Sequence, residues 1–292
     1  MAYRFSGLLL AVLALAACGR AGSDPVKNTV IGHQQATLAA LRAIPEADIV
    51  RAKQKLVVAY GHTSHGSQLV SGMGPLDRFM GGRGLYTFSG NGQAGALRLL
   101  DGAMPSDCGY TSGTAGVMQY EIDTRKFLGE ANAQGRGSAQ PAVNVVMWSF
   151  CGQMSGFDPA KEVRWYLDGM TRLEKTYPGI AFVYMTGHLD GSGVAGRLNQ
   201  NNEVVRAYCR ANGKWLFDFA DIESYDPDGH EYLSRGANDN CDYQGGNWAR
   251  EWQAKHREGV DWYQCDAAHS QALNGNRKAY GAWALFAAIA RS

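Results

Sequence analysis

The chain lacks an excess of charge of either sign: its 292 residues hold 28 Lys and Arg against 27 Asp and Glu, and no basic block stands out. Proteins that bind nucleic acid need clustered cations to neutralise phosphates, so nucleic acid is not an expected partner. The sequence also lacks a C-x-x-C pair, which argues against a thiolate zinc site. We therefore expect that the protein holds neither a metal ion nor a cofactor.

Long apolar runs are also scarce, and the clearest one lies at the amino terminus. Residues 8–17 are unbrokenly apolar and follow Arg4, but this run is too short to span a bilayer as a helix. The pattern is typical of a secretory signal peptide. The run ends in Leu-Ala-Ala-Cys at Cys18, which resembles the bacterial lipobox. An ordinary cleavage site beside an unrelated cysteine is the alternative.

The lipobox predicts three segments: a signal peptide over residues 1–17, a lipidated tether over residues 18–28 and one folded domain over residues 29–292. Lipid on Cys18 would anchor the protein stably, because several acyl chains on one residue bind a membrane firmly. We expect no other contact with a membrane. Gly19, rather than Asp, follows the cysteine, which favours the outer membrane or the cell surface. We therefore expect an exported bacterial lipoprotein.

Six cysteines are present, and five remain if Cys18 carries lipid. Disulfides form and persist in oxidising compartments, so an exported chain with five thiols can form at most two of them. We expect Cys241 to pair with Cys265, because this disulfide would close a long polar loop. Cys108 with Cys151 is the second expected pair, and one thiol is left over.

Apolar strands alternate with amphipathic helices along the rest of the chain, and no internal repeat is evident. This alternation predicts a single α/β domain, a doubly wound parallel sheet covered by helices on both faces. Sites in such sheets lie beyond the carboxyl ends of the strands. The expected strands are residues 56–60, 85–88, 143–150, 180–185 and 215–219; the expected helices are 68–80, 158–177, 198–211 and 276–290; a Gly-rich stretch runs over 90–116.

Reactive side chains gather where these strands end. Ser64 follows the first strand in a Gly-flanked turn, which exposes its hydroxyl beside helix N–H groups that can hold an oxyanion. A serine nucleophile needs a histidine base that a carboxylate orients. Asp266 and His269 are three residues apart before the last helix and can supply both groups. The pattern predicts a triad of Ser64, His269 and Asp266, although Ser64 as a helix N-cap is the alternative.

These motifs resemble the SGNH (GDSL-like) hydrolase superfamily. The Asp266 and His269 pair matches the family's D-x-x-H motif in spacing and position. The segment Gly61-His62-Thr63-Ser64 stands where the family carries its nucleophilic serine, with one residue inserted and no Asp. The resemblance implies a flavodoxin-like fold and ester hydrolysis, in which Ser64 attacks the carbonyl, His269 shuttles the proton and Asp266 orients His269.

The same resemblance implies an oxyanion hole. Residues 91–95 resemble the family's second block, whose glycine N–H would correspond to Gly95. The N–H of Ser64 would be a second donor. The family's third block supplies an Asn, which this chain lacks, and the side-chain amide of Gln153 would replace it.

Several other polar residues follow the strands, and their role stays open. His62, His65, His188 and Asp190 can line a polar substrate pocket. Alternatively, the same four residues can bind zinc, with the three histidines as the cluster of a metal-dependent hydrolase, because imidazole and carboxylate are suitable ligands. Cys151 is a further candidate nucleophile, although a disulfide is the commoner state of a cysteine in an exported protein.

Residues 222–265 form an insertion too long for an ordinary loop, which indicates a functional segment. Its aromatic side chains can stack on sugars or form a small core of their own. The predicted surface location and this insertion favour an acyl (acetyl) ester on a polysaccharide or glycoconjugate as substrate. A non-catalytic glycan-binding lipoprotein is the alternative. The aromatic residues are Tyr225, Tyr232, Tyr243, Trp248, Trp252, Trp262 and Tyr263.

Overall fold

The computed structural model describes Met1 and residues 30–292, so the predicted signal peptide, the lipidated Cys18 and the tether lie outside the described residues. The centre of the fold is a seven-stranded, all-parallel sheet with the order β1-β7-β6-β5-β2-β4-β3. Its strands are β1 (Val30–Ile31), β2 (Val57–Gly61), β3 (Phe88–Ser89), β4 (Leu97–Met104), β5 (Val145–Trp148), β6 (Ala181–Met185) and β7 (Trp215–Phe217).

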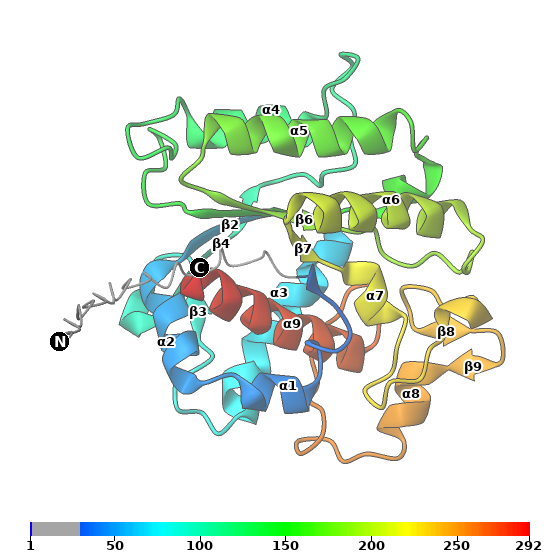
Figure 1. Cartoon of the computed structure of the whole chain (residues 1–292). Helices are drawn as coiled ribbons and strands as arrows, with labels where there is room; N and C mark the ends of the chain where they lie inside the picture. Colours follow the sequence, from blue (N-terminus) through cyan, green and yellow to red (C-terminus); the bar gives the residue numbers. More distant parts are fainter. Residues whose placement is uncertain (2–29) are drawn as a thin grey trace.

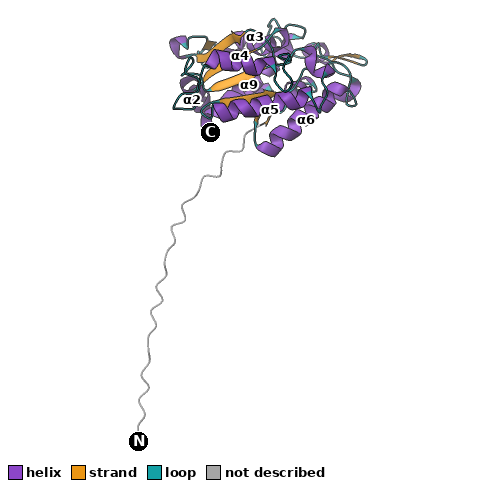
Figure 2. Ribbon diagram, turned by 90° about the horizontal axis from the view of Figure 1, so that it is seen from above, coloured by secondary structure: helices purple, strands orange, loops and turns teal. Residues whose placement is uncertain are grey.

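Helices cover both faces of this sheet (Figure 1). One layer holds α4 (Gln119–Leu128), α5 (Glu162–Thr176) and α6 (Arg197–Asn212); the other holds α1 (Leu38–Ala43), α2 (Glu46–Lys55), α3 (Ser64–Phe79) and α9 (Ala272–Arg291). Figure 2 shows the strands beside α4 and α5 from above. Each layer buries its own hydrophobic core against the sheet. Among the described residues, no helix combines the length and the apolar character that crossing a membrane requires.

The prediction of an α/β fold with a parallel sheet is confirmed, and the strand order is consistent with a flavodoxin-like fold. From central β2 the chain forms β3 and then β4 on one side, and it then crosses back to β5 on the other side. The strand order therefore reverses between β2 and β5. Ligands of open α/β sheets bind at such a switch point, outside the carboxyl ends of the strands.

The sequence-based prediction missed β4, which lies inside the Gly-rich stretch, and also α4 directly after it. Arg98, Asp101 and Gly102 interrupt the apolar pattern of β4, and its middle is exposed. Only the two-residue β3 pairs with its outer side. A strand near a sheet edge needs fewer apolar side chains, so the hydrophobic pattern gives little sign of it.

The insertion folds against the end of the sheet at which β7 leads into α7 (Phe219–Glu223), as Figure 1 shows. It contains the hairpin of β8 (Asp242–Tyr243) and β9 (Gly246–Asn247), followed by α8 (Trp248–Gln253). Most of its aromatic rings are buried, which leaves fewer of them for contact with sugars. The buried rings are those of Tyr232, Trp248, Trp252, Trp262 and Tyr263.

The two expected disulfides are absent, because the five cysteines of residues 30–292 are all free. Their sulfur atoms contact other groups. The sulfur of Cys241 lies 3.7 Å from the Ser270 hydroxyl. Cys265 donates to the Ala272 carbonyl at 3.4 Å, and Cys108 faces the Trp148 carbonyl at 3.7 Å. The prediction of Cys241–Cys265 and Cys108–Cys151 pairs is therefore wrong for this structure.

A fully buried ion pair joins the elements that carry the polar strand ends. The Lys278 ammonium of α9 lies 2.6 Å from Glu223 of α7, and both side chains are 0% exposed. Lys278 also donates to the side-chain carbonyl of Gln68 in α3. Gln68 in turn donates to the Ala268 carbonyl at 2.5 Å. The second oxygen of Glu223 accepts the Leu189 N–H at 2.7 Å.

This pair predicts a large stability effect. Replacement of Lys278 with Met leaves the Glu223 carboxylate buried without a cation, so we expect a loss of about 3–5 kcal/mol in the free energy of unfolding. The double variant Lys278→Met with Glu223→Gln removes both charges and should lose less. Urea unfolding of the two variants tests this expectation. A loss below about 1 kcal/mol in Lys278→Met would contradict it.

Candidate active site

The switch point between β2 and β5 brings His65 and Cys151 together. His65 lies in the first turn of α3, which begins three residues after β2 ends, and Cys151 lies three residues after the end of β5. The close approach of these segments requires glycine at position 66. A Cβ atom there would lie 2.1 Å from the Ser149 hydroxyl and 2.4 Å from the His62 Cβ. Gly66 thus lets the start of α3 pack directly against the end of β5.

His65 connects a thiol to a carboxylate. Its Nδ1 lies 3.1 Å from the Cys151 sulfur, and its Nε2 lies 2.9 Å from Asp239 Oδ2. Asp239 belongs to the insertion, where its N–H donates to the Leu189 carbonyl at 3.0 Å. His65 is buried, whereas Cys151 and Asp239 are half-buried. Candidate nucleophile, base and orienting carboxylate therefore stand in hydrogen-bond sequence, as nucleophilic catalysis requires.

The surroundings favour a neutral imidazole next to an ionised carboxylate. Burial lowers the pKa of His65, and this effect outweighs the opposing hydrogen bond to Asp239. For Asp239, burial raises the pKa, but the favourable interactions of the carboxylate, first among them the hydrogen bond from His65, outweigh burial and lower the pKa. Because a carboxylate only accepts hydrogen bonds, His65 Nε2 carries the proton in this pair. Nδ1 is then free to accept the proton of the Cys151 thiol.

Two further histidines surround His65. The His188 ring lies face to face with the His65 ring, with the centroids 3.7 Å apart and the planes 1° from parallel. The His269 ring stacks with the His65 ring at 4.6 Å. His269 is exposed and has a left-handed backbone with φ 62°, which is uncommon for a residue other than glycine. The site is therefore a cluster of three imidazoles.

The predicted serine triad is only partly assembled. Ser64 is the first residue of α3, and its hydroxyl lies 3.9 Å from the Cys151 sulfur. Within residues 30–292, no hydrogen bond joins Ser64 to His269 or Asp266 to His269, and the Asp266 side chain is exposed. The N-cap of α3 is Thr63, so the alternative role of Ser64 as N-cap is wrong. The structure brings Ser64 and His269 to the same cluster without pairing them.

The predicted oxyanion donors lie in different places. Gly95 is exposed and precedes β4, so it lies at the amino end of the sheet, opposite Ser64. The Gly95 N–H therefore cannot reach an oxyanion formed at Ser64, and this prediction is corrected. Gln153 does lie at the site: its side-chain carbonyl accepts the Cys151 N–H at 3.2 Å, and its amide nitrogen lies 3.3 Å from Asp107.

The proposed histidine pocket divides into two parts. His62 lies 2.5 Å from Asp101 through Nε2, and its Nδ1 lies 2.9 Å from the Thr63 carbonyl. Burial opposes protonation of His62, but the hydrogen bonds to Asp101 and Thr63 outweigh it and raise the pKa of His62. Asp190 is exposed and accepts the Ser192 N–H. The residue that lies with His65 and His188 is therefore Asp239, and His62 and Asp190 stand outside this group.

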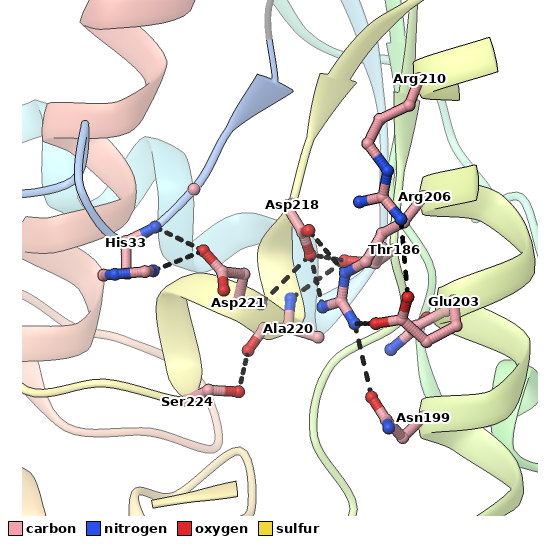
Figure 3. A network of polar contacts seen from close by, with 12 residues as sticks. His33, Thr186, Asn199, Glu203, Arg206, Arg210, Asp218, Ala220, Asp221 and Ser224 are labelled. Carbon is pink, nitrogen blue, oxygen red and sulfur yellow. Dashed lines mark hydrogen bonds and ion pairs between the residues drawn. The ribbon is translucent and has the colours of Figure 1, made fainter. Parts of the chain in front are cut away.

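A second buried network holds the loop that carries His188. Figure 3 shows the part of this network that joins Arg206, Asp218 and Thr186. Arg206 of α6 binds Asp218 with two hydrogen bonds, of 2.6 and 2.8 Å. Asp218 also accepts the Thr186 hydroxyl at 3.0 Å, which fixes the end of β6. Asn202 then bonds both the N–H and the carbonyl of Gly187. The backbone before His188 is thus held rigidly against α6 and α7.

Asp239 is the residue of the site that the sequence analysis missed. It is one acid among many in the polar insertion, and it stands 174 positions from His65. No spacing or motif marks it in the sequence. Cys151 follows a predicted strand and is a candidate nucleophile in the sequence, but the expected disulfide favours a structural role for it.

The chain was also compared with known proteins: no protein-family model, no curated protein and no solved structure matches it. The chemistry of the site therefore rests on its own geometry.

The geometry predicts that Cys151 reacts fastest among the cysteines of residues 30–292. Cys265 is the matched control, because it is also partly exposed, but burial raises its pKa to about 12. In native protein, iodoacetamide should alkylate Cys151 well before Cys265, as resolved by peptide mass spectrometry. Replacement of His65 with Gln should slow alkylation of Cys151 at least about tenfold, because the base is lost. Equal rates at Cys151 and Cys265 would contradict this assignment.

Proposed function

We propose that this protein hydrolyses an acyl ester with Cys151 as nucleophile, His65 as general base and Asp239 as orienting group. The observation that carries the proposal is the position of His65, which bonds the Cys151 thiol with one ring nitrogen and the Asp239 carboxylate with the other. The location at the switch point of the sheet supports it, because sites of this fold class lie there.

The reaction follows from these contacts. The Cys151 sulfur attacks the ester carbonyl while its proton passes to His65 Nδ1. The tetrahedral intermediate collapses to a thioester, and the alcohol leaves with the proton from His65. Water then attacks the thioester, again with His65 as base, and releases the acid and the free thiol. Asp239 holds the ring and stabilises the imidazolium that forms in each half of the cycle.

The substrate that we propose is a short acyl group, such as acetyl, on a polysaccharide or glycoconjugate. Around Cys151 the side chains of Ser64, Gln153 and His269 are polar and at least partly exposed. Such an open, polar rim suits a small acyl group on a large polar alcohol. The export and lipid anchor proposed from residues 1–18 would place the protein where such polymers occur.

A second version of the same function uses Ser64, as the SGNH resemblance implies. The observations in its favour are the strand order and the position of Ser64 at the start of α3, directly beyond central β2. His269 would serve as base after a movement that brings it to the Ser64 hydroxyl. Both versions place the reaction at the same edge of the sheet, but they differ in the atom that becomes acylated.

Hydrolysis of p-nitrophenyl acetate by the purified protein tests the proposal. Replacement of Cys151 with Ala, or of His65 with Gln, should lower kcat/KM by about 10²–10⁴-fold, because the nucleophile or the base is lost. Asp239→Asn should lower it less, since it keeps a hydrogen-bonding group. His256, which stacks on Trp252 in the insertion, provides the matched control as His256→Gln, with unchanged activity expected.

Ser64→Ala separates the two versions. The thiol version predicts that this variant keeps most of the activity and that a fluorophosphonate probe leaves the protein unlabelled. Loss of activity in Ser64→Ala together with Ser64-dependent labelling, while Cys151→Ala stays active, would establish the serine version instead. A folded protein without activity on any activated ester would contradict both.

A further inference from the structure

His188 has a ring nitrogen without a partner. Its Nδ1 lies 2.9 Å from the Leu189 carbonyl, which can only accept a hydrogen bond, so Nδ1 carries the proton. Nε2 therefore presents a lone pair. This atom is buried and has no hydrogen-bond partner among the described residues, and the whole residue is only 8% exposed. A buried acceptor without a donor is costly, which indicates that another group binds this nitrogen.

Two other potential ligands lie beside the His188 ring. His65, His188 and Asp239 each offer one ligand atom, and these atoms all lie within 4.8 Å of one another. In a tetrahedral zinc site, ligand atoms about 2.0–2.1 Å from the ion lie about 3.3 Å apart. The limit of 4.8 Å exceeds this spacing by up to about 1.5 Å, so binding draws the three ligand atoms together. The parallel rings of His65 and His188 also tilt toward each other, so that both nitrogens point at one ion.

The hydrogen bonds that orient His188 and Asp239 are of the kind that metal ligands make. A ligating histidine typically donates its other N–H to a carbonyl or carboxylate, which fixes the ring. His188 has this bond to Leu189, and the Leu189 N–H is held by Glu223. The Asp239 N–H donates to the Leu189 carbonyl. One rigid loop therefore positions both His188 and Asp239.

We propose that His65, His188 and Asp239 bind a divalent transition-metal ion of the zinc class, with a fourth coordination position open to water. Two imidazoles and one carboxylate form the ligand set of a zinc site with an open position. The proposal concerns binding and does not rest on ester hydrolysis. It departs from the metal cluster expected from the sequence, because Asp239 takes part and His62, bonded to Asp101, does not.

Metal binding and thiol catalysis exclude each other at His65. The catalytic arrangement needs the proton on Nε2 and a lone pair on Nδ1 toward Cys151. A metal ion on Nε2 needs the lone pair there, which moves the proton to Nδ1. Nδ1 then cannot accept the proton of Cys151, although the two atoms stay 3.1 Å apart. The ion therefore acts as a switch on His65: it selects the other tautomer and removes the ring as acceptor of the Cys151 proton.

Isothermal titration of the metal-free full chain with zinc chloride tests the site. We expect about one strongly bound ion per chain. Loss of a residue that only orients a ligand weakens metal binding by about 10–100-fold. His188→Gln and Asp239→Asn each remove a ligand, so they should weaken binding more than this. His62→Gln is the matched control, since it removes a neighbouring histidine outside the ligand set. Circular dichroism and thermal unfolding confirm that each variant is folded.

His230→Gln tests whether zinc binds at a second place, because the ligand atoms of Asp226, Asp228 and His230 also lie within 4.8 Å of one another. Zinc binding that is unchanged in both His188→Gln and Asp239→Asn would overturn the proposal, as would loss in His230→Gln alone. Absence of strong binding to the wild-type protein would overturn it as well.

Alkylation of Cys151 by iodoacetamide gives a separate readout of the switch. Zinc should slow this alkylation in the wild-type protein and leave it unchanged in His188→Gln, which keeps the thiol, His65 and Asp239. If Cys151 proves unreactive in the metal-free protein, the proposed hydrolysis by the thiol fails, while the binding titration still decides the metal site. Equal slowing in the wild type and in His188→Gln would contradict the proposed ligand set.

Discussion

The buried pair of Lys278 and Glu223 is the interaction on which the rest of the site depends. Two charges at 0% exposure are tolerated only when they compensate each other and when their remaining donors and acceptors are used. Here the remaining groups bind Gln68 of α3 and the Leu189 N–H. Through Gln68 the pair also reaches the Ala268 carbonyl, next to His269. One ion pair thus ties together the segments that carry all three histidines of the cluster.

This constraint explains how residues from distant parts of the fold keep their relative positions although no disulfide links residues 30–292. His65 is fixed by the start of α3, and Cys151 by the close packing that Gly66 permits. His188 and Asp239 meet at Leu189, whose N–H is bound by Glu223. The chemistry of the site then reduces to one question, which is where the proton of His65 lies. With the proton on Nε2 the ring activates a thiol; with the proton on Nδ1 it can bind a metal ion.

The sequence predicted the parts of this arrangement that depend on local pattern. Periodic apolar runs located β2, β5 and β6, and the rule that sites follow such strands pointed to Ser64, His65 and His188. The partners of these residues could not be read in the same way. Asp239 belongs to a polar loop, and only the folding of the insertion over the sheet edge brings it to His65. The expected disulfides failed for a similar reason, because spacing along the chain does not reveal where a sulfur atom points.

The most direct test of the account is to locate the acyl group on the enzyme during turnover. The metal-free protein would be mixed with p-nitrophenyl acetate, quenched in acid within the first turnovers, digested and analysed by peptide mass spectrometry. The account predicts an acetyl group on Cys151, present as a thioester that neutral hydroxylamine removes, and absent from His65→Gln. An acetyl group on Ser64 instead, or no acyl intermediate in a protein that does hydrolyse the ester, would contradict it.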